Sequence, residues 1–185
     1  MTVFISMLRG INVGGHNKIK MEELRALCES LGLSQVKTHI QSGNVVFKSK
    51  ERDPEKLAHR IDAAFEHKFK FRPSLILRTT SEFREALARN PFATRKGIHP
   101  GKLLITFLSG EPAAPAREKT LKLDIKPEEL HIIGREMFVY FPNGMGRPKF
   151  SWSLVEKHLN VSGTGRNLNT VQKLLEMAEA IESAD

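Results

Sequence analysis

The first 79 residues alternate between strand-like and helical patterns in an order that few folds accept: strand, helix, strand, strand, helix, strand. Short apolar or β-branched runs predict strands at residues 3–8, 36–41, 45–47 and 74–79. Apolar residues recur at helical spacing over residues 21–31 and, after the capping pair Asp53-Pro54, over residues 57–69. This order is that of a ferredoxin-like domain. We therefore predict a four-stranded antiparallel sheet in the strand order 4-1-3-2, with both helices on one face.

The second half repeats this order less clearly. Strand-like runs lie at residues 103–108, 130–133, 137–141 and 161–167, and helical patterns lie at residues 115–123 and 152–159. A helix at 81–88 links the halves, and a final helical pattern carries an apolar stripe from Leu168 to Ile181. The two hairpins have similar sequences, HIQSGNVVF and HIIGREMFVYF. We therefore predict an α+β fold: a tandem duplication of two ferredoxin-like βαββαβ domains with antiparallel sheets, plus a C-terminal helix. The first domain is expected at residues 1–79, and the second, with the linking and C-terminal helices, at residues 80–185.

Several familiar chemistries are excluded by the residues themselves. The chain has one cysteine, Cys28, and no two of its seven histidines have a metal-ligand spacing, so no metal is predicted. Gly10 and Gly15 have the glycine spacing of a P-loop, but His16-Asn17 follow where that motif needs Lys and Ser or Thr. A dinucleotide fold fails because the G-x-G-x-x-G motif is missing. No catalytic residue and no cofactor are predicted. The apolar runs are too short to cross a bilayer, and no basic segment precedes the first one, so we expect a cytoplasmic protein without a membrane partner.

Polar and basic residues gather on the loops that the predicted topology brings to one end of the first sheet. These loops are LRGINVGGHNKIK at residues 8–20, the hairpin turn QSGN and the connection HKFKFRPS. The candidate ligand-binding residues are Arg9, Asn12, Asn17, Lys18, Lys20, Gln41, Ser42 and Asn44, with Lys68, Lys70 and Arg72 expected nearby. Glycines among them let backbone N–H groups approach a ligand, so a small anionic or phosphorylated ligand is the expected guest. The alternative is that glycine and asparagine serve only to make tight turns.

The charge of the chain keeps a second function open. The formal net charge is +8, and residues 1–79 carry 14 basic and 8 acidic side chains. A positive field attracts nucleic acid as well as small anions, so nucleic acid is a possible partner. The third strand, NVVFKS, lacks the paired aromatic residues with which ferredoxin-like RNA-binding modules stack bases. A third alternative is a hydrolase or transferase whose catalytic groups assemble between the domains.

Three segments resemble a known family. LRGINVGGHNKIKMEELRALCESLGLSQVKTHIQSGNVVF (residues 8–47), ELHIIGREMFVYFPNGMGRPKF and GTGRNLNTVQKLLEMA are similar to the domain-of-unknown-function family 1697. The resemblance covers nearly the whole chain and implies a duplication of two ferredoxin-like domains. It implies no biochemical activity, because the family has none established.

The chain departs from the usual pattern of that family at three positions. The family usually has Tyr at His39 and Ser at Pro148, and it often has Trp at Leu168. The neighbouring Arg166, Asn167 and Asn169 are secondary binding candidates. Their alternative role is to begin the final helix, with Asn169 as its N-cap and Gln172 three residues later.

Overall fold

The computed structural model describes residues 1–14, 16–146 and 151–184. The chain folds into two compact units, Met1–Arg84 with Lys173–Asp185 (unit 1) and Glu85–Gln172 (unit 2). This division groups the end of the C-terminal helix with the first sheet. The units therefore differ from the sequence-based domains, 1–79 and 80–185, whose boundaries stay a prediction. No helix in the described part of the chain is long and apolar enough to cross a membrane.

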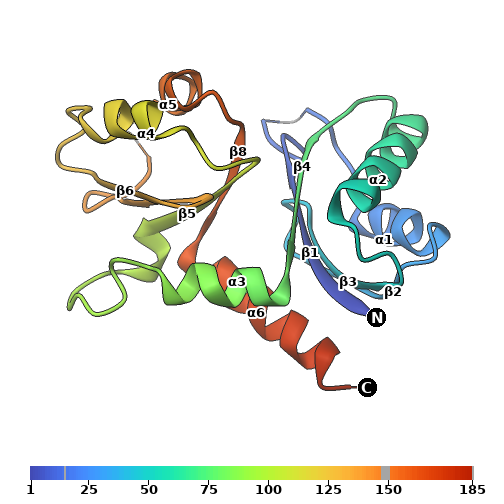
Figure 1. Cartoon of the computed structure of the whole chain (residues 1–185). Helices are drawn as coiled ribbons and strands as arrows, with labels where there is room; N and C mark the ends of the chain where they lie inside the picture. Colours follow the sequence, from blue (N-terminus) through green and yellow to red (C-terminus); the bar gives the residue numbers. More distant parts are fainter. Residues whose placement is uncertain (15, 147–150, 185) are drawn as a thin grey trace. The chain divides into compact units, whose positions relative to one another are not determined.

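Unit 1 contains the first predicted sheet, in the predicted strand order (Figure 1). Its strands are β1 (Thr2–Arg9), β2 (Ser34–His39), β3 (Asn44–Ser49) and β4 (Ser74–Thr79), and its helices are α1 (Met21–Ser30) and α2 (Pro54–Phe69). The order across the sheet is β2-β3-β1-β4, and every pairing is antiparallel. β1 therefore lies between β3 and β4, and the prediction 4-1-3-2 is confirmed. Both helices lie on one side of the sheet in Figure 1.

Unit 2 repeats this topology. Its strands are β5 (Leu103–Leu108), β6 (Glu129–Ile133), β7 (Glu136–Tyr140) and β8 (Gly163–Asn167), and its helices are α4 (Ala114–Leu121), α5 (Trp152–Leu159) and the short η1 (Pro100–Lys102). The order β6-β7-β5-β8 is that of the first sheet with each strand replaced by its counterpart, and the pairings are antiparallel. The predicted duplication is confirmed. The junctions of the two units fall within two helices, α3 (Thr80–Ala88) and α6 (Leu168–Glu182).

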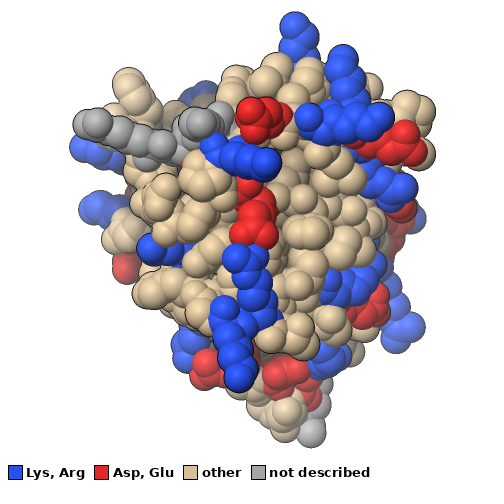
Figure 2. Space-filling view, turned by 90° about the vertical axis from the view of Figure 1, so that its left-hand side faces the viewer, with Lys and Arg blue, Asp and Glu red and all other residues tan. Residues whose placement is uncertain are grey.

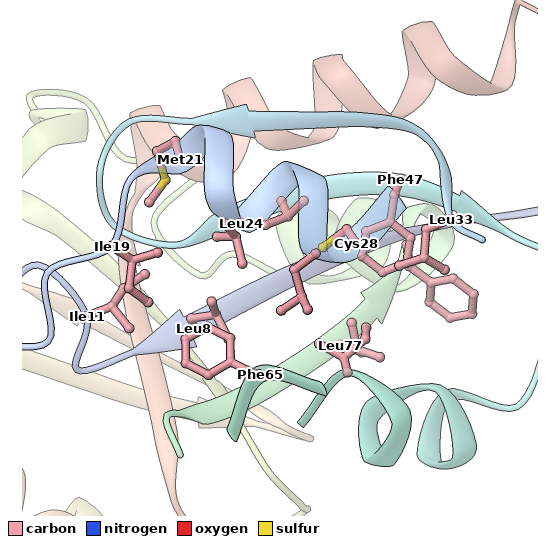
Figure 3. Packing of buried hydrophobic residues seen from close by; sticks show 14 of the residues in the cluster. Leu8, Ile11, Ile19, Met21, Leu24, Cys28, Leu33, Phe47, Phe65 and Leu77 are labelled. Atoms are coloured by element: carbon pink, nitrogen blue, oxygen red, sulfur yellow. The ribbon is translucent and has the colours of Figure 1, made fainter. Parts of the chain in front are cut away.

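The core of unit 1 lies between its sheet and its two helices. Alternate residues of the strands, such as Phe4 and Phe47, are fully buried in one cluster with residues of both helices. Figure 3 shows Phe47 in this cluster with Leu24 of α1 and Phe65 of α2. α2 begins where the sequence predicts, because the side chain of Asp53 accepts hydrogen bonds from the backbone N–H groups of residues 55 and 56. This packing fixes the end of β1 and the start of α1, and so the two ends of the loop that joins them.

Candidate ligand pocket in unit 1

The β1–α1 and β2–β3 connections of unit 1 are longer than their counterparts in unit 2, whereas its α1–β2 and β3–α2 connections are shorter. The β1–α1 loop runs over residues 10–20, whereas the β5–α4 connection runs over residues 109–113. The β2–β3 hairpin turn occupies residues 40–43, and the β6–β7 turn occupies only residues 134–135. Unit 2 shows that the shorter connections are sufficient for this topology. The β1–α1 loop of unit 1 has six more residues than its counterpart, and the β2–β3 turn has two more.

The β1–α1 loop is anchored to the core by two isoleucines and to itself by two asparagines. Ile11 and Ile19 are 2% and 3% exposed and join the hydrophobic core of unit 1 (Figure 3). Between them, Asn12 Nδ2 donates to the carbonyl oxygen of Ile19 (3.1 Å), and Asn12 Oδ1 accepts from its N–H (2.8 Å). Asn17 Nδ2 donates to the carbonyl oxygen of Gly10 (2.9 Å). These two side-chain amides add to two backbone hydrogen bonds within the loop, of 3.1 and 3.0 Å.

The β2–β3 hairpin packs directly on this loop. Asn12 Nδ2 also donates to the carbonyl oxygen of Gln41 (2.9 Å). Gly43 has φ +74°, and a Cβ atom there would lie 2.6 Å from Ile11 Cδ1 and 2.7 Å from Leu8 Cβ. Only glycine fits this approach. Asn44, which is fully buried, closes the turn by donating to the carbonyl oxygen of residue 39 (3.2 Å) and to Ser42 Oγ (2.8 Å).

A pocket of about 550 Å³ lies among the loop, the hairpin and the first turn of α1. The residues that line it are Asn12, Lys18, Ile19, Lys20, Glu22, Glu23 and Gln41. Its volume is within the range of sites that bind small molecules, roughly 300–1,000 Å³. Asn12, Lys18, Lys20 and Gln41 are among the candidates named from the sequence. The sequence-based reasoning missed Glu22 and Glu23, although their position in the first helical turn after the loop places them beside it.

The charged groups of the pocket differ in the ion pairs and hydrogen bonds that they form within the protein. Lys18 and Lys20 are exposed, and no carboxylate of the described residues forms an ion pair with either ammonium group. Glu22 Oε1 lies 3.2 Å from an Arg25 guanidinium nitrogen. The pKa of the Glu22 carboxyl is lowered, first by a backbone N–H bond and then by Arg25, so it stays ionised at neutral pH. Glu23 Oε2 accepts one long hydrogen bond, 3.4 Å, from the N–H of Lys20.

The remaining candidates of the first sheet do not line the pocket. Arg9 is exposed at the end of β1, while Asn17, Ser42 and Asn44 take part in the hydrogen bonds that shape the two loops. Of the three cations expected nearby, Lys68 Nζ donates to the carbonyl oxygen of residue 23 (3.0 Å). Lys70 ends α2 in a left-handed conformation, and Arg72 Nε lies 3.8 Å from a carboxylate oxygen of Glu66. Lys68 thus contacts the first turn of α1.

The secondary candidates lie where β8 passes into α6. Arg166 donates to Thr164 Oγ1 and to the carbonyl oxygen of Gly165, both at 2.8 Å, and burial lowers the pKa of its guanidinium to about 10. Asn167 Oδ1 accepts from the N–H of Thr170 (2.9 Å), so Asn167 caps the helix. The segment begins a helix, as the alternative role predicted, but the cap is Asn167 and not Asn169.

The three departures from the family pattern have different surroundings. His39 is half-buried at the end of β2, and Leu168 is 9% exposed in the first turn of α6. Pro148, like Gly15, lies outside the described residues.

Metal and thiol chemistry find no support in the described parts of the chain. No group of three or more His, Cys, Asp or Glu side chains there could hold a metal ion. Cys28 is buried in the core of unit 1, and burial raises the pKa of its thiol to about 12. At neutral pH it is a protonated core side chain rather than a nucleophile.

Comparison with known proteins identifies relatives of the whole chain but no activity. The model of a family described as "Protein of unknown function (DUF1697)" matches residues 1–138. No curated protein matches the chain. A solved structure described as that of a conserved bacterial protein from Streptococcus pneumoniae has 26% sequence identity and a TM-score of 0.72. The alignment covers 96% of this chain and 98% of that one, so the two share the duplicated architecture.

Proposed function

The chain belongs to the DUF1697 family, whose description states no activity, and we propose a function from the pocket alone: the protein binds a small anionic ligand, such as a phosphate ester, in unit 1. Lys18 and Lys20 supply the positive charge, and the side chain of Gln41 supplies a neutral hydrogen-bonding group. Asn12 has a supporting role, because its amide already binds backbone groups of the loop and the hairpin.

The observation that carries this proposal is the asymmetry between the two copies of the fold. Two connections that are longer in unit 1 than in unit 2, residues 10–20 and 40–43, supply most of the residues that line the pocket. Added loop residues on a rigid scaffold are a common location for binding sites. A connection that only joins a strand to a helix can be shorter, because five residues, 109–113, make the equivalent connection in unit 2.

The chemistry of the pocket favours an anion with several oxygens. The ammonium groups of Lys18 and Lys20, which form no ion pair with the described residues, are available to a phosphate or carboxylate. Hydrogen bonds to charged groups are about twice as strong as neutral ones. The buried side chain of Ile19 gives the pocket an apolar floor, and Gln41 adds both a donor and an acceptor. Six of the seven lining residues are polar or charged, so the pocket is more polar than the usual small-molecule site and suits a charged ligand.

The experiment compares Lys18→Ala with Lys50→Ala. Lys50 is also exposed, but it follows the far end of β3 from the hairpin, so it controls for the change in net charge. We expect phosphate to raise the melting temperature of the wild type and of Lys50→Ala, because a ligand that binds only the folded state stabilises it. The Lys18→Ala protein should need about fivefold more phosphate for the same shift. A wild type that phosphate, sulfate and a panel of nucleotides all leave unshifted would contradict the proposal.

Nucleic-acid binding is the alternative, and the net charge of +8 favours it. Figure 2 shows Lys and Arg residues mixed with Asp and Glu on the face that it draws, without a continuous basic area. A nucleic-acid-binding protein releases counterions, so its affinity must fall steeply with salt. Fluorescence anisotropy with single- and double-stranded probes between about 50 and 200 mM salt decides the question. A steep slope with submicromolar affinity would favour the alternative, and weak binding of every probe would dismiss it.

A further inference from the structure

The pocket of unit 1 is not simply basic. Four of the residues that line it are charged, and these are two lysines and two glutamates, so the formal charge of the lining is zero. A ligand that carried only negative charge would meet the carboxylates of Glu22 and Glu23 as well as the ammonium groups of Lys18 and Lys20. We infer that the ligand is amphoteric: it presents an ammonium or similar cation to the two glutamates while its anion contacts the two lysines. This inference rests on the proposed function.

The two carboxylates retain capacity for such a partner. Glu22 Oε1 lies 3.2 Å from Arg25, and the side chain of Glu22 is 75% exposed. Glu23 accepts one hydrogen bond, and that bond is long at 3.4 Å. An ionised carboxyl group can accept about four hydrogen bonds, so the described residues saturate neither group. A cation with N–H donors could bind either carboxylate without displacing a contact that the structure shows.

Helix capping accounts for part of this arrangement but not for all of it. Acidic residues in a first helical turn stabilise the helix, and Glu23 stands three residues after Lys20 at the position where a capping-box acid is expected. In unit 2, the first turn of α4 contains no acidic residue, although that helix occupies the same place in the fold. The two glutamates are therefore found with the pocket of unit 1 and are not required by the topology that both units share. The helix dipole also favours negative charge there, which keeps the carboxylates ionised and able to bind a cation.

The test uses two probes that differ in one ammonium group: O-phosphoethanolamine and ethyl phosphate. Each is titrated into ¹⁵N-labelled full-length protein, and dissociation constants are obtained from the amide shifts of Ile19, Glu23 and Gln41. The wild type should bind phosphoethanolamine about fivefold more tightly than ethyl phosphate, the most that one exposed ion pair usually contributes. In the double variant Glu22→Gln/Glu23→Gln this ratio should fall to about one, while ethyl phosphate binds more tightly than before. Gln at the second position can still make the capping bond, so the variant should fold.

Glu29→Gln is the matched control, because Glu29 is an exposed acid at the other end of α1. It removes one negative charge from the same helix and should leave the wild-type ratio unchanged. If the wild type binds both probes equally, the amphoteric ligand is overturned while the anion site stands. If the protein binds neither probe, the inference and the proposed function both fail. If Glu29→Gln lowers the ratio as far as the double variant does, net charge rather than the pocket sets the preference, and the inference is again overturned.

Discussion

Substitution of Asn12 by alanine tests whether this side chain holds the wall of the pocket. The change removes three hydrogen bonds at once: two between the Asn12 amide and the backbone of Ile19, and one from Nδ2 to the carbonyl oxygen of Gln41. The loop would then be tied to the hairpin and to the start of α1 by fewer contacts. We expect the folded state to lose stability even when no ligand is present.

The magnitude follows from the surroundings of each partner. Ile19 is 3% exposed, so its N–H loses a partner that water cannot readily replace, at a cost of about 1–2 kcal/mol. The carbonyl group of exposed Gln41 becomes hydrated and costs little. Asn12 has φ +53°, a conformation that costs alanine about 1 kcal/mol more than asparagine. The sum is about 2–3 kcal/mol, which corresponds to a fall in melting temperature of roughly 4–12 °C for a chain of this size.

The assay is urea unfolding of the two variants Asn12→Ala and Asn12→Gly, followed by hydrogen exchange at the Ile19 amide. Glycine tolerates the positive φ, so the difference between the variants isolates the backbone cost from the lost hydrogen bonds. The Ile19 amide should lose most of its protection in both. If Asn12→Ala unfolds within about 0.5 kcal/mol of the wild type and Ile19 keeps its protection, the side chain is not an anchor, and the reasoning is refuted.

Two further results are expected. Gly43→Ala should destabilise the protein by about 3 kcal/mol in urea unfolding, because the added Cβ overlaps Ile11 and Leu8 at a positive φ. The control Gly10→Ala should cost about 1 kcal/mol, because its φ is +80° but no atom lies within 4 Å of the added Cβ. Equal losses of stability in the two variants would contradict the argument. Cys28 should react with a thiol reagent at pH 8 only after unfolding. Burial, and to a smaller extent the charge of Glu29, raises the pKa of its thiol to about 12, so almost no thiolate is present. Rapid reaction of the folded protein would contradict this.

The sequence predicted the sheets better than the pocket. Strand order could be inferred because six elements joined by short connections leave few antiparallel arrangements, and β4 and β5 lie where their apolar runs predicted. Element ends were less certain: β8 begins at Gly163 rather than at residue 161, and α4 begins at Ala114, one residue before the expected Pro115. The predicted cap, Asn169, was wrong for the same reason. The position of a helix cap depends on where the preceding strand ends, and here the cap is Asn167.

The position of the pocket could be predicted from the sequence, but the contacts of its side chains could not. Topology alone places the β1–α1 loop and the β2–β3 hairpin at one end of the sheet. The direction of each side chain depends on backbone angles that no spacing reveals. Asn12, which has φ +53°, binds backbone groups of the loop and the hairpin, whereas Lys18 is exposed. Glu22 was overlooked because an acid in a first helical turn has an ordinary explanation in the helix dipole.

The winding of the β1–α1 loop has a consequence for binding kinetics. Gly10, Asn12, Gly14 and Asn17 all have positive φ, and the two asparagine amides tie the loop to itself. A wall held in this way is already formed before a ligand arrives, so no closing step should delay association. Encounter would then depend on diffusion and on attraction by the lysines, and chemically related ligands would enter at similar rates. They would be distinguished by how long each remains bound.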